Sequence, residues 1–129
     1  MQHAAIVGWG KCLPPAVLSN KDLESFFETS DDWITQRTGI HERRVSHVLL
    51  GEMAYVAAER ALAAAGLAGR DVELIVFGTC SFDEQVPNMA SGLQRRIGSP
   101  SAAAMDVNTA CTSFLYGLST ATAMIRNGI

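Results

Sequence analysis

Residues 102–118 read AAAMDVNTACTSFLYGL, and this stretch decides the class of fold. Residues 102–107 form an apolar run that predicts a short strand. After the turn at residues 108–110, apolar side chains recur at helical spacing from Cys111 onward, which predicts an amphipathic helix. A strand that leads at once into a helix is typical of α/β proteins. We therefore predict an α/β fold with Cys111 at the start of a helix.

The position of Cys111 makes it a candidate nucleophile. The first N–H groups of a helix lack partners and carry the positive end of its dipole, so a helix start favours the thiolate form of a cysteine. The small neighbours Ala110 and Ser113 leave the sulfur accessible. The spacing alone is equally compatible with a buried structural cysteine, because cysteine is often found inside proteins.

The rest of the chain also alternates predicted strands and helices. The alanine-rich residues 52–65, closed by Gly66, have strong helix propensity, and the continuous apolar run at residues 74–77 is typical of a parallel strand buried on both faces. The expected strands are residues 4–9, 74–77 and 102–107. The expected helices are residues 21–28, 31–39, 52–65, 88–97 and one from residue 111 onward. The last is expected to pack inward through Phe114, Leu115, Leu118, Ala121 and Ile125.

Composition narrows the classes of function. A chain of 129 residues with 48% hydrophobic residues suits one domain with a core, and a net charge of −3 with interspersed signs argues against binding to nucleic acid or an anionic membrane surface. Three widely spaced cysteines, Cys12, Cys80 and Cys111, argue against a disulfide framework or a metal site. With neither a signal peptide nor a membrane-spanning run, we expect a cytoplasmic protein.

Three stretches together resemble the β-ketoacyl-acyl carrier protein synthase III family of the thiolase superfamily. The first is the Gly-x-Gly-x-x-x-Pro pattern at residues 8–14, and the second is TSDDWI at residues 29–34 with the following RTGI and ER at residues 37–43. The third is DVNTACTSFLYG at residues 106–117. The resemblance spans essentially the whole chain.

The resemblance implies a thiolase-like fold, of which residues 1–129 are an incomplete N-terminal domain. That fold has two similar halves in an αβαβα arrangement, and this chain supplies most of the first half. The family's catalytic histidine and asparagine lie in the second half and are absent from this chain. We therefore expect a truncated chain that is inactive by itself.

The implied activity is that of an acyltransferase that initiates fatty-acid-type synthesis. An acyl group passes from coenzyme A to Cys111, and malonyl-acyl carrier protein then loses CO2 and attacks the thioester. No cofactor is permanently bound, since acyl-coenzyme A is a substrate. Trp33, Arg37 and Thr29 match positions that contact coenzyme A in the family. From the residues alone, Trp33 reads as a core residue of a helix and Arg37 as a solvated cation.

The resemblance also implies a homodimer, in which Val86 reaches across the interface into the partner's acyl pocket. Because family members often carry an aromatic residue there, the smaller valine predicts a longer or branched primer. The alternative interpretation of Val86 is an ordinary loop residue. Two alternative functions stay open: a related acyl-coenzyme A condensing enzyme of the polyketide starter type, and a non-catalytic thiolase-like partner subunit.

Overall fold

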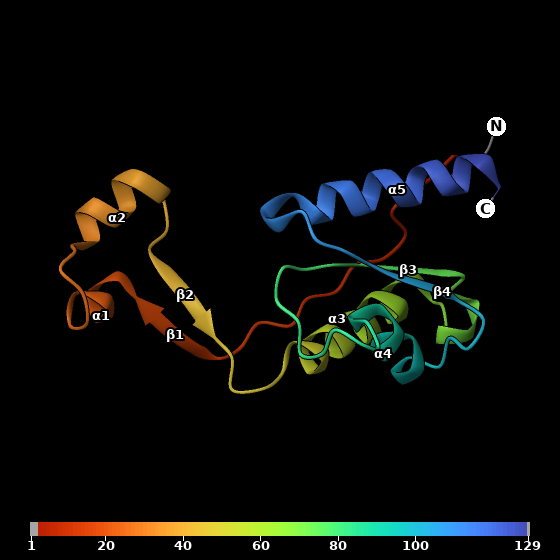
Figure 1. Ribbon diagram of the computed structural model, residues 1–129, viewed down its shortest axis with the longest axis horizontal. Helices are drawn as coiled ribbons and strands as arrows, with labels where there is room; N and C mark the ends of the chain where they lie inside the picture. Colours follow the sequence, from red (N-terminus) through yellow and green to blue (C-terminus); the bar gives the residue numbers. More distant parts are fainter. Residues whose placement is uncertain (1–2, 129) are drawn as a thin grey trace. The chain divides into compact units, whose positions relative to one another are not determined.

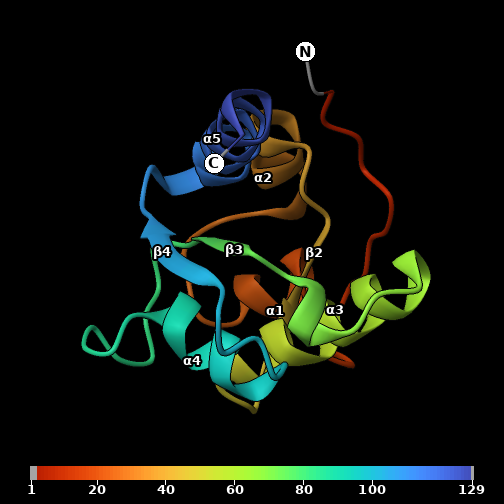
Figure 2. The same ribbon diagram turned by 90° about the vertical axis from the view of Figure 1, so that its right-hand side faces the viewer.

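A computed structural model of the chain describes residues 3–128, which fall into two compact units. The small unit is Leu13–Val48, and the large unit comprises the described residues up to Cys12 and from Leu49 onward. The prediction that residues 1–129 form one domain stays a prediction. Figures 1 and 2 show the elements of each unit from two sides.

The large unit is built on a parallel pair of strands, β3 (Leu74–Gly78) and β4 (Ala103–Val107), with Leu74 opposite Ala103 and Gly78 opposite Val107. α5 (Ser113–Asn127) covers one face of the pair, and α4 (Met89–Arg96) covers the other, with α3 (Leu50–Ala65) packed against α4 (Figure 2). The predicted α/β arrangement of these elements is confirmed.

The core of the large unit lies between the strands and α4. Ile75, Ala90 and Ala102 are buried there. Partly buried apolar side chains surround them, namely Val72, Phe77, Leu93, Ile97 and Ala104. Burial of this apolar surface is the main force that holds α4 against the sheet.

α5 packs on β3 through small residues rather than through its apolar stripe. Ser113 and Gly117 are its buried residues, and a Cβ added at Gly117 would lie 3.3 Å from Cγ1 of Val76. Phe114 and Leu115 are 71% and 62% exposed. The prediction of inward packing is therefore wrong for these two side chains and for Leu118 and Ile125, which are 40% and 42% exposed, whereas Ala121 is partly buried. The close approach of α5 to β3 is made at Ser113 and Gly117 instead.

The predicted strand at residues 4–9 is also wrong, since the structure has no strand there. The main chain instead lies against α3. Gly8 and Gly10 have no room for a Cβ because backbone atoms of Ala57 and Ala61 are in the way, and Arg60 donates a hydrogen bond to the carbonyl oxygen of Lys11 at 2.6 Å. A strand requires a ladder partner, and among the described residues neither β3 nor β4 pairs with this segment.

The small unit contains an antiparallel pair, β1 (Ala16–Ser19) and β2 (Glu42–Val45), and two short helices, α1 (Asn20–Glu24) and α2 (Asp31–Thr38). Both strands are absent from the sequence-based prediction. Ser19 and Asp22 form a reciprocal capping box at the start of α1. α2 begins after Ser30, which caps the N–H of Trp33, and ends at Gly39 with a φ of 70°.

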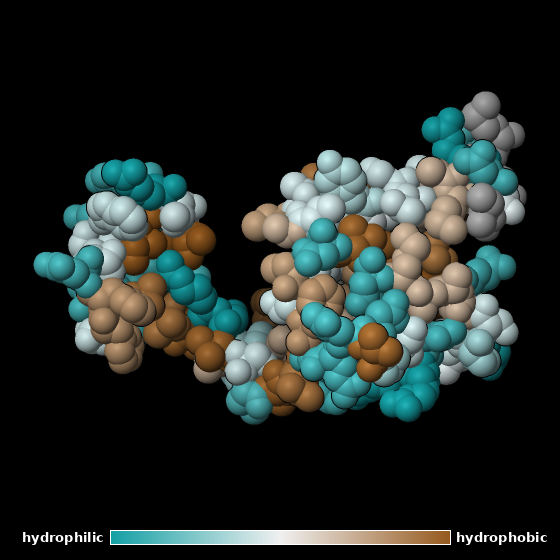
Figure 3. All heavy atoms as spheres, in the orientation of Figure 1, coloured by the Kyte–Doolittle hydropathy of each residue, from teal (hydrophilic) through white to brown (hydrophobic). Residues whose placement is uncertain are grey.

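α1 ends four residues before the predicted end at residue 28. The hydroxyl and N–H of Ser25 both donate to the carbonyl oxygen of Asp22, and the N–H of Phe26 bonds to Leu23 instead. The side chain of Ser25 thus competes for the acceptor that the next helical turn would use. Phe26 and Phe27 consequently lie outside the helix and are exposed. Figure 3 shows apolar side chains, in brown, at the surface of both units.

Candidate active site

Cys111 lies in a tight turn between β4 and α5. The turn is a single 3-10 segment, Ala110–Thr112, and α5 begins at Ser113. The cysteine is exposed and forms no disulfide. The unpaired N–H groups at the start of α5 and its dipole favour negative charge near this turn. The geometry is therefore suited to an accessible sulfur nucleophile, and the described residues do not bury Cys111.

The residue before Cys111 has an unusual backbone. Ala110 has a φ of 48°, in the left-handed region that residues with a Cβ rarely occupy. Such a conformation costs about 1–2 kcal/mol relative to the right-handed region. Strained backbones of this kind persist where neighbouring contacts enforce them and are often found at functional sites.

Ser113 supplies the contacts that hold the turn. Its Oγ accepts a hydrogen bond from the N–H of Thr109 at 3.0 Å and donates to the carbonyl oxygen of Ala110 at 2.9 Å. The hydroxyl of Thr112 also donates to the carbonyl oxygen of Thr109, at 2.7 Å. Ser113 is only 4% exposed. Sequence reasoning treated Ser113 only as a small neighbour, whereas its buried hydroxyl shapes the turn that carries Cys111.

A glycine on β3 sets how closely the start of α5 approaches the sheet. A Cβ added at Gly78 would lie 3.0 Å from the Cβ of Ser113 and 3.2 Å from its carbonyl carbon. Gly78 also pairs with Val107 on β4. The turn with Cys111 is thus seated at the carboxyl ends of both strands, where α/β proteins commonly build their sites.

Thr29, Trp33 and Arg37 lie in the small unit: Thr29 just before α2, Trp33 in its first turn and Arg37 in its last turn. Thr29 and Trp33 line an open pocket of about 360 Å³, with Glu28 and Ser30. The guanidinium of Arg37 lies 5.2 Å from the centroid of the Trp33 ring, within cation–π range. Trp33 is 55% exposed, so it is a surface aromatic rather than a core residue of the small unit. The structure thus brings the three predicted coenzyme A residues together.

Asn20 connects the elements around this pocket. Its side-chain amide donates to Oδ1 of Asp31 at 2.7 Å, to the carbonyl oxygen of Ile40 at 2.8 Å and to Oγ1 of Thr35 at 3.3 Å. Its Oδ1 accepts a hydrogen bond from Arg43. Asn20 is 1% exposed, and its hydrogen bond lowers the pKa of Asp31 below its ordinary value. Sequence reasoning missed this role.

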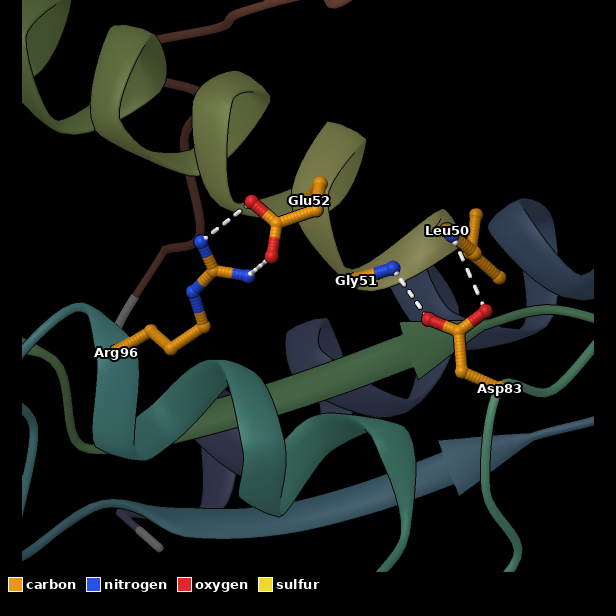
Figure 4. Close-up of polar contacts among 5 residues, drawn as sticks. All are labelled: Leu50, Gly51, Glu52, Asp83 and Arg96. Carbon is orange, nitrogen blue, oxygen red and sulfur yellow. Dashed lines mark hydrogen bonds and ion pairs between the residues drawn. The ribbon is translucent and has the colours of Figure 1, made fainter. Parts of the chain in front are cut away.

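Val86 lies in the loop between β3 and α4 and is 90% exposed. The same loop contains Asp83, whose two carboxylate oxygens accept hydrogen bonds from the N–H groups of Leu50 and Gly51, at 3.1 and 2.7 Å (Figure 4). The loop is therefore held by the first turn of α3.

Two further features concern cofactors and membranes. Within residues 3–128, we find no group of three or more His, Cys, Asp or Glu side chains placed to bind a metal ion. None of the helices described combines the length and the apolar character needed to cross a membrane.

Known proteins match both this sequence and this fold. The family model for 3-oxoacyl-[acyl-carrier-protein (ACP)] synthase III matches residues 105–129, which include the Cys111 turn. The chain is 56% identical over 124 residues to beta-ketoacyl-[acyl-carrier-protein] synthase III 2 of Vibrio cholerae, covering 96% of this chain and 34% of that protein.

Two solved structures extend the match to the fold. The crystal structure of 3-oxoacyl-[acyl-carrier-protein] synthase III from Aquifex aeolicus superposes with a TM-score of 0.91 at 39% identity, over 95% of this chain and 40% of that one. The priming beta-ketosynthase from the R1128 polyketide biosynthetic pathway gives a TM-score of 0.86 at 28% identity, over 92% and 36%. The predicted thiolase-like fold is confirmed.

The chain spans about a third of the length of its Vibrio relative and two fifths of the Aquifex protein. Within that span, sequence identity, the fold and the match over the Cys111 turn agree with one another. Over nearly its whole length, this chain is similar to one part of β-ketoacyl-[acyl-carrier-protein] synthase III proteins.

Proposed function

We propose that the protein containing this chain is an acyltransferase that condenses an acyl-coenzyme A primer with malonyl-acyl carrier protein through a thioester on Cys111. The observation that carries the proposal is the exposed Cys111 in a strained turn at the start of α5. A nucleophile held in this way divides one difficult carbon–carbon bond formation into two easier steps.

The first step is transfer of the acyl group. The thiolate of Cys111 attacks the thioester carbonyl carbon, the bond to the coenzyme A sulfur breaks, and the released thiolate takes a proton from water. N–H groups at the start of α5 are suited to stabilising the oxyanion that forms on the carbonyl oxygen.

The second step forms the carbon–carbon bond. Malonyl-acyl carrier protein loses CO2, and the electron pair left on its α-carbon attacks the acyl carbon on Cys111. The carbon–sulfur bond then breaks, which returns the thiolate and leaves a β-ketoacyl-acyl carrier protein. Cys111 is the residue of this chain that carries the acyl group between the two steps.

Thr29, Trp33 and Arg37 are proposed to bind coenzyme A. Arg37 lies over the Trp33 ring, while Thr29 and Trp33 share an open pocket. An aromatic face of this kind stacks on an adenine, and a guanidinium pairs with phosphate oxygens. The clustering of three suitable groups on one short segment supports this assignment.

The remaining parts of the proposal concern assembly, primer and location. We propose a homodimer in which the exposed Val86 contributes to the partner's acyl pocket, and a primer longer or more branched than acetyl. The protein would have no permanently bound cofactor. Free cysteines at positions 12, 80 and 111 fit a reducing cytoplasm.

A second candidate function is condensation in a polyketide starter pathway. The fold match to the priming beta-ketosynthase of the R1128 pathway favours it. The two candidates share the acyl transfer to Cys111 and differ in the fate of the product. Product analysis with acyl carrier proteins of fatty-acid and polyketide pathways separates them.

The test uses the full-length protein encoded by the gene. With acyl-coenzyme A and malonyl-acyl carrier protein, we expect free coenzyme A, CO2 and β-ketoacyl-acyl carrier protein in equal amounts. Cys111→Ala should abolish the product, whereas Cys80→Ala, which changes another exposed cysteine, should retain it. Unchanged product formation by Cys111→Ala would refute the proposal.

A further inference from the structure

The loop that carries Val86 is capped onto a distant helix by Asp83. α3 begins after Leu49, which offers no side-chain cap, and the N–H groups of Leu50 and Gly51 are instead satisfied by Asp83, more than 30 residues along the chain. Gly51 suits this contact, because a Cβ there would lie 3.2 Å from a carboxylate oxygen of Asp83. A carboxylate at a helix N-terminus also interacts favourably with the dipole.

The first turn of α3, to which the loop is bound, is linked to α4 by an ion pair. Arg96 of α4 makes a two-pronged ion pair with Glu52 of α3, at 2.5 and 2.8 Å (Figure 4). Its guanidinium also lies 4.5 Å from the centroid of the Tyr55 ring. Two-pronged pairs of this kind fix orientation as well as distance. The first turn of α3, which Asp83 caps, is therefore held against α4.

A second carboxylate holds the far end of the loop. Asp106 of β4 accepts hydrogen bonds from the N–H groups of Met89 and Ala90 at the start of α4, at 2.9 and 2.8 Å. Asp106 lies five residues before Cys111 on the same strand-to-turn path. The loop end is thus tied directly to the strand that leads to the nucleophile.

Val86 lies between these two attachments. Among the described residues, Asp83 makes the only hydrogen bonds found between positions 82 and 87. Val86 nevertheless projects outward, 90% exposed. The position of this side chain therefore depends on the Asp83 cap on one side and on Asp106 on the other.

We propose that Asp83 is a positioning residue for primer selection, which acts by holding the Val86 loop on the first turn of α3. The proposal rests on the proposed function, in which Val86 borders the acyl pocket. When the loop is fixed at Asp83, the side chain of Val86 holds one position at the acyl pocket and so limits which primers fit. Releasing the loop lets Val86 move, and discrimination between primers falls.

The test measures kcat/KM of the full-length protein with acetyl-, isobutyryl- and octanoyl-coenzyme A. We expect Asp83→Ala to reduce the ratio of kcat/KM between the best and the poorest primer by about fivefold or more. The reason is that one methylene in a fitted pocket changes kcat/KM by about 10-fold or more. Asp83→Asn, which keeps one oxygen acceptor, should give an intermediate ratio. Glu84→Ala is the matched control, because Glu84 has the same charge on the same loop and makes no hydrogen bond within residues 3–128.

A double-mutant cycle separates positioning from a general structural effect. In a Val86→Ala background, Asp83→Ala should change the primer ratio by less than about twofold, because the residue through which it acts is already truncated. An equal loss of kcat/KM for all primers in Asp83→Ala would overturn the proposal. So would a change of the primer ratio by Asp83→Ala that is as large in the Val86→Ala background as in the unsubstituted protein.

Hydrogen exchange provides a readout independent of catalysis. Asp83→Ala should speed exchange of the Leu50 and Gly51 amides about tenfold, while Glu84→Ala leaves them unchanged. Equal exchange in the unsubstituted protein and Asp83→Ala would overturn the proposed contact. Failure of the proposed function shows itself differently, as absence of acyl transfer in the unsubstituted protein.

Discussion

Asn20 provides a stringent test of how the small unit is held together. Asn20→Ala removes the bonds from its amide to the carbonyl oxygen of Ile40 and from Arg43 to its Oδ1, both inside a site that is 1% exposed. A neutral hydrogen bond contributes about 1 kcal/mol and one to a charged group about 2 kcal/mol, so we expect a loss of about 3 kcal/mol in local stability. The hydrogen bond to Asp31 is left out of this sum, because water can replace the amide at an ionised carboxylate.

Native-state hydrogen exchange on the full-length protein measures this loss. Amides of α2 should exchange about 100-fold faster in Asn20→Ala, since 1.4 kcal/mol corresponds to a factor of ten. The matched control is Asn127→Ala, which removes a single exposed hydrogen bond to the carbonyl oxygen of Ala123. An acceleration in α2 below about threefold, or one equal to that in the control, would refute the role assigned to Asn20.

Three further predictions test the large unit and the coenzyme A pocket. The hydrogen bond from Arg96 lowers the pKa of Glu52 below its ordinary value of 4.5, so the pair stabilises the fold at neutral pH and this contribution is lost as the pH falls from that value through the lowered pKa. The stability difference between the unsubstituted protein and Glu52→Gln, measured by denaturation, should therefore vanish in acid, and a difference independent of pH would contradict it. Gly78→Ala should force Ser113 outward and lower stability by about 1–3 kcal/mol, and an unchanged Tm would show that the contact is loose. Trp33→Ala should raise KM for acyl-coenzyme A about tenfold with little change in kcat, whereas a fall in kcat alone would exclude a binding role.

The elements that could be predicted from the sequence are those with strong local signals. Residues 52–65 have helix-forming composition and a closing glycine, and α3 ends at Gly66 as predicted. The apolar run at residues 74–77 became β3, and its parallel pairing with β4 is confirmed. In these segments the local sequence pattern and the observed element agree, so the pattern is sufficient for the prediction.

The elements that were missed or misassigned depend on contacts between distant residues. β1 and β2 pair across more than 20 residues and carry exposed or charged side chains, so neither has the apolar alternation of a half-buried strand. The helix at residues 21–28 was predicted too long because one hydroxyl, that of Ser25, captures a carbonyl oxygen. Propensity is a weak guide where a single side-chain hydrogen bond ends an element.

In the candidate site, too, local sequence signals predict the position of a residue but not its contacts. The position of Cys111 before a helix follows from residue type and periodicity, and the structure places it two residues before α5. The contacts that shape its surroundings do not follow from the sequence. The left-handed Ala110 is not a glycine, the buried hydroxyl of Ser113 bonds to backbone atoms, and the partners of Asp83 lie more than 30 residues away.

The most direct test of the central claim is to identify the residue that receives the acyl group. The full-length protein is incubated with acyl-coenzyme A alone, and its peptides are examined by mass spectrometry. We predict one acyl thioester, on the peptide that contains Cys111, and its absence in Cys111→Ala. Acylation of Cys12 or Cys80 instead, or no acylation of the unsubstituted protein, would contradict the account.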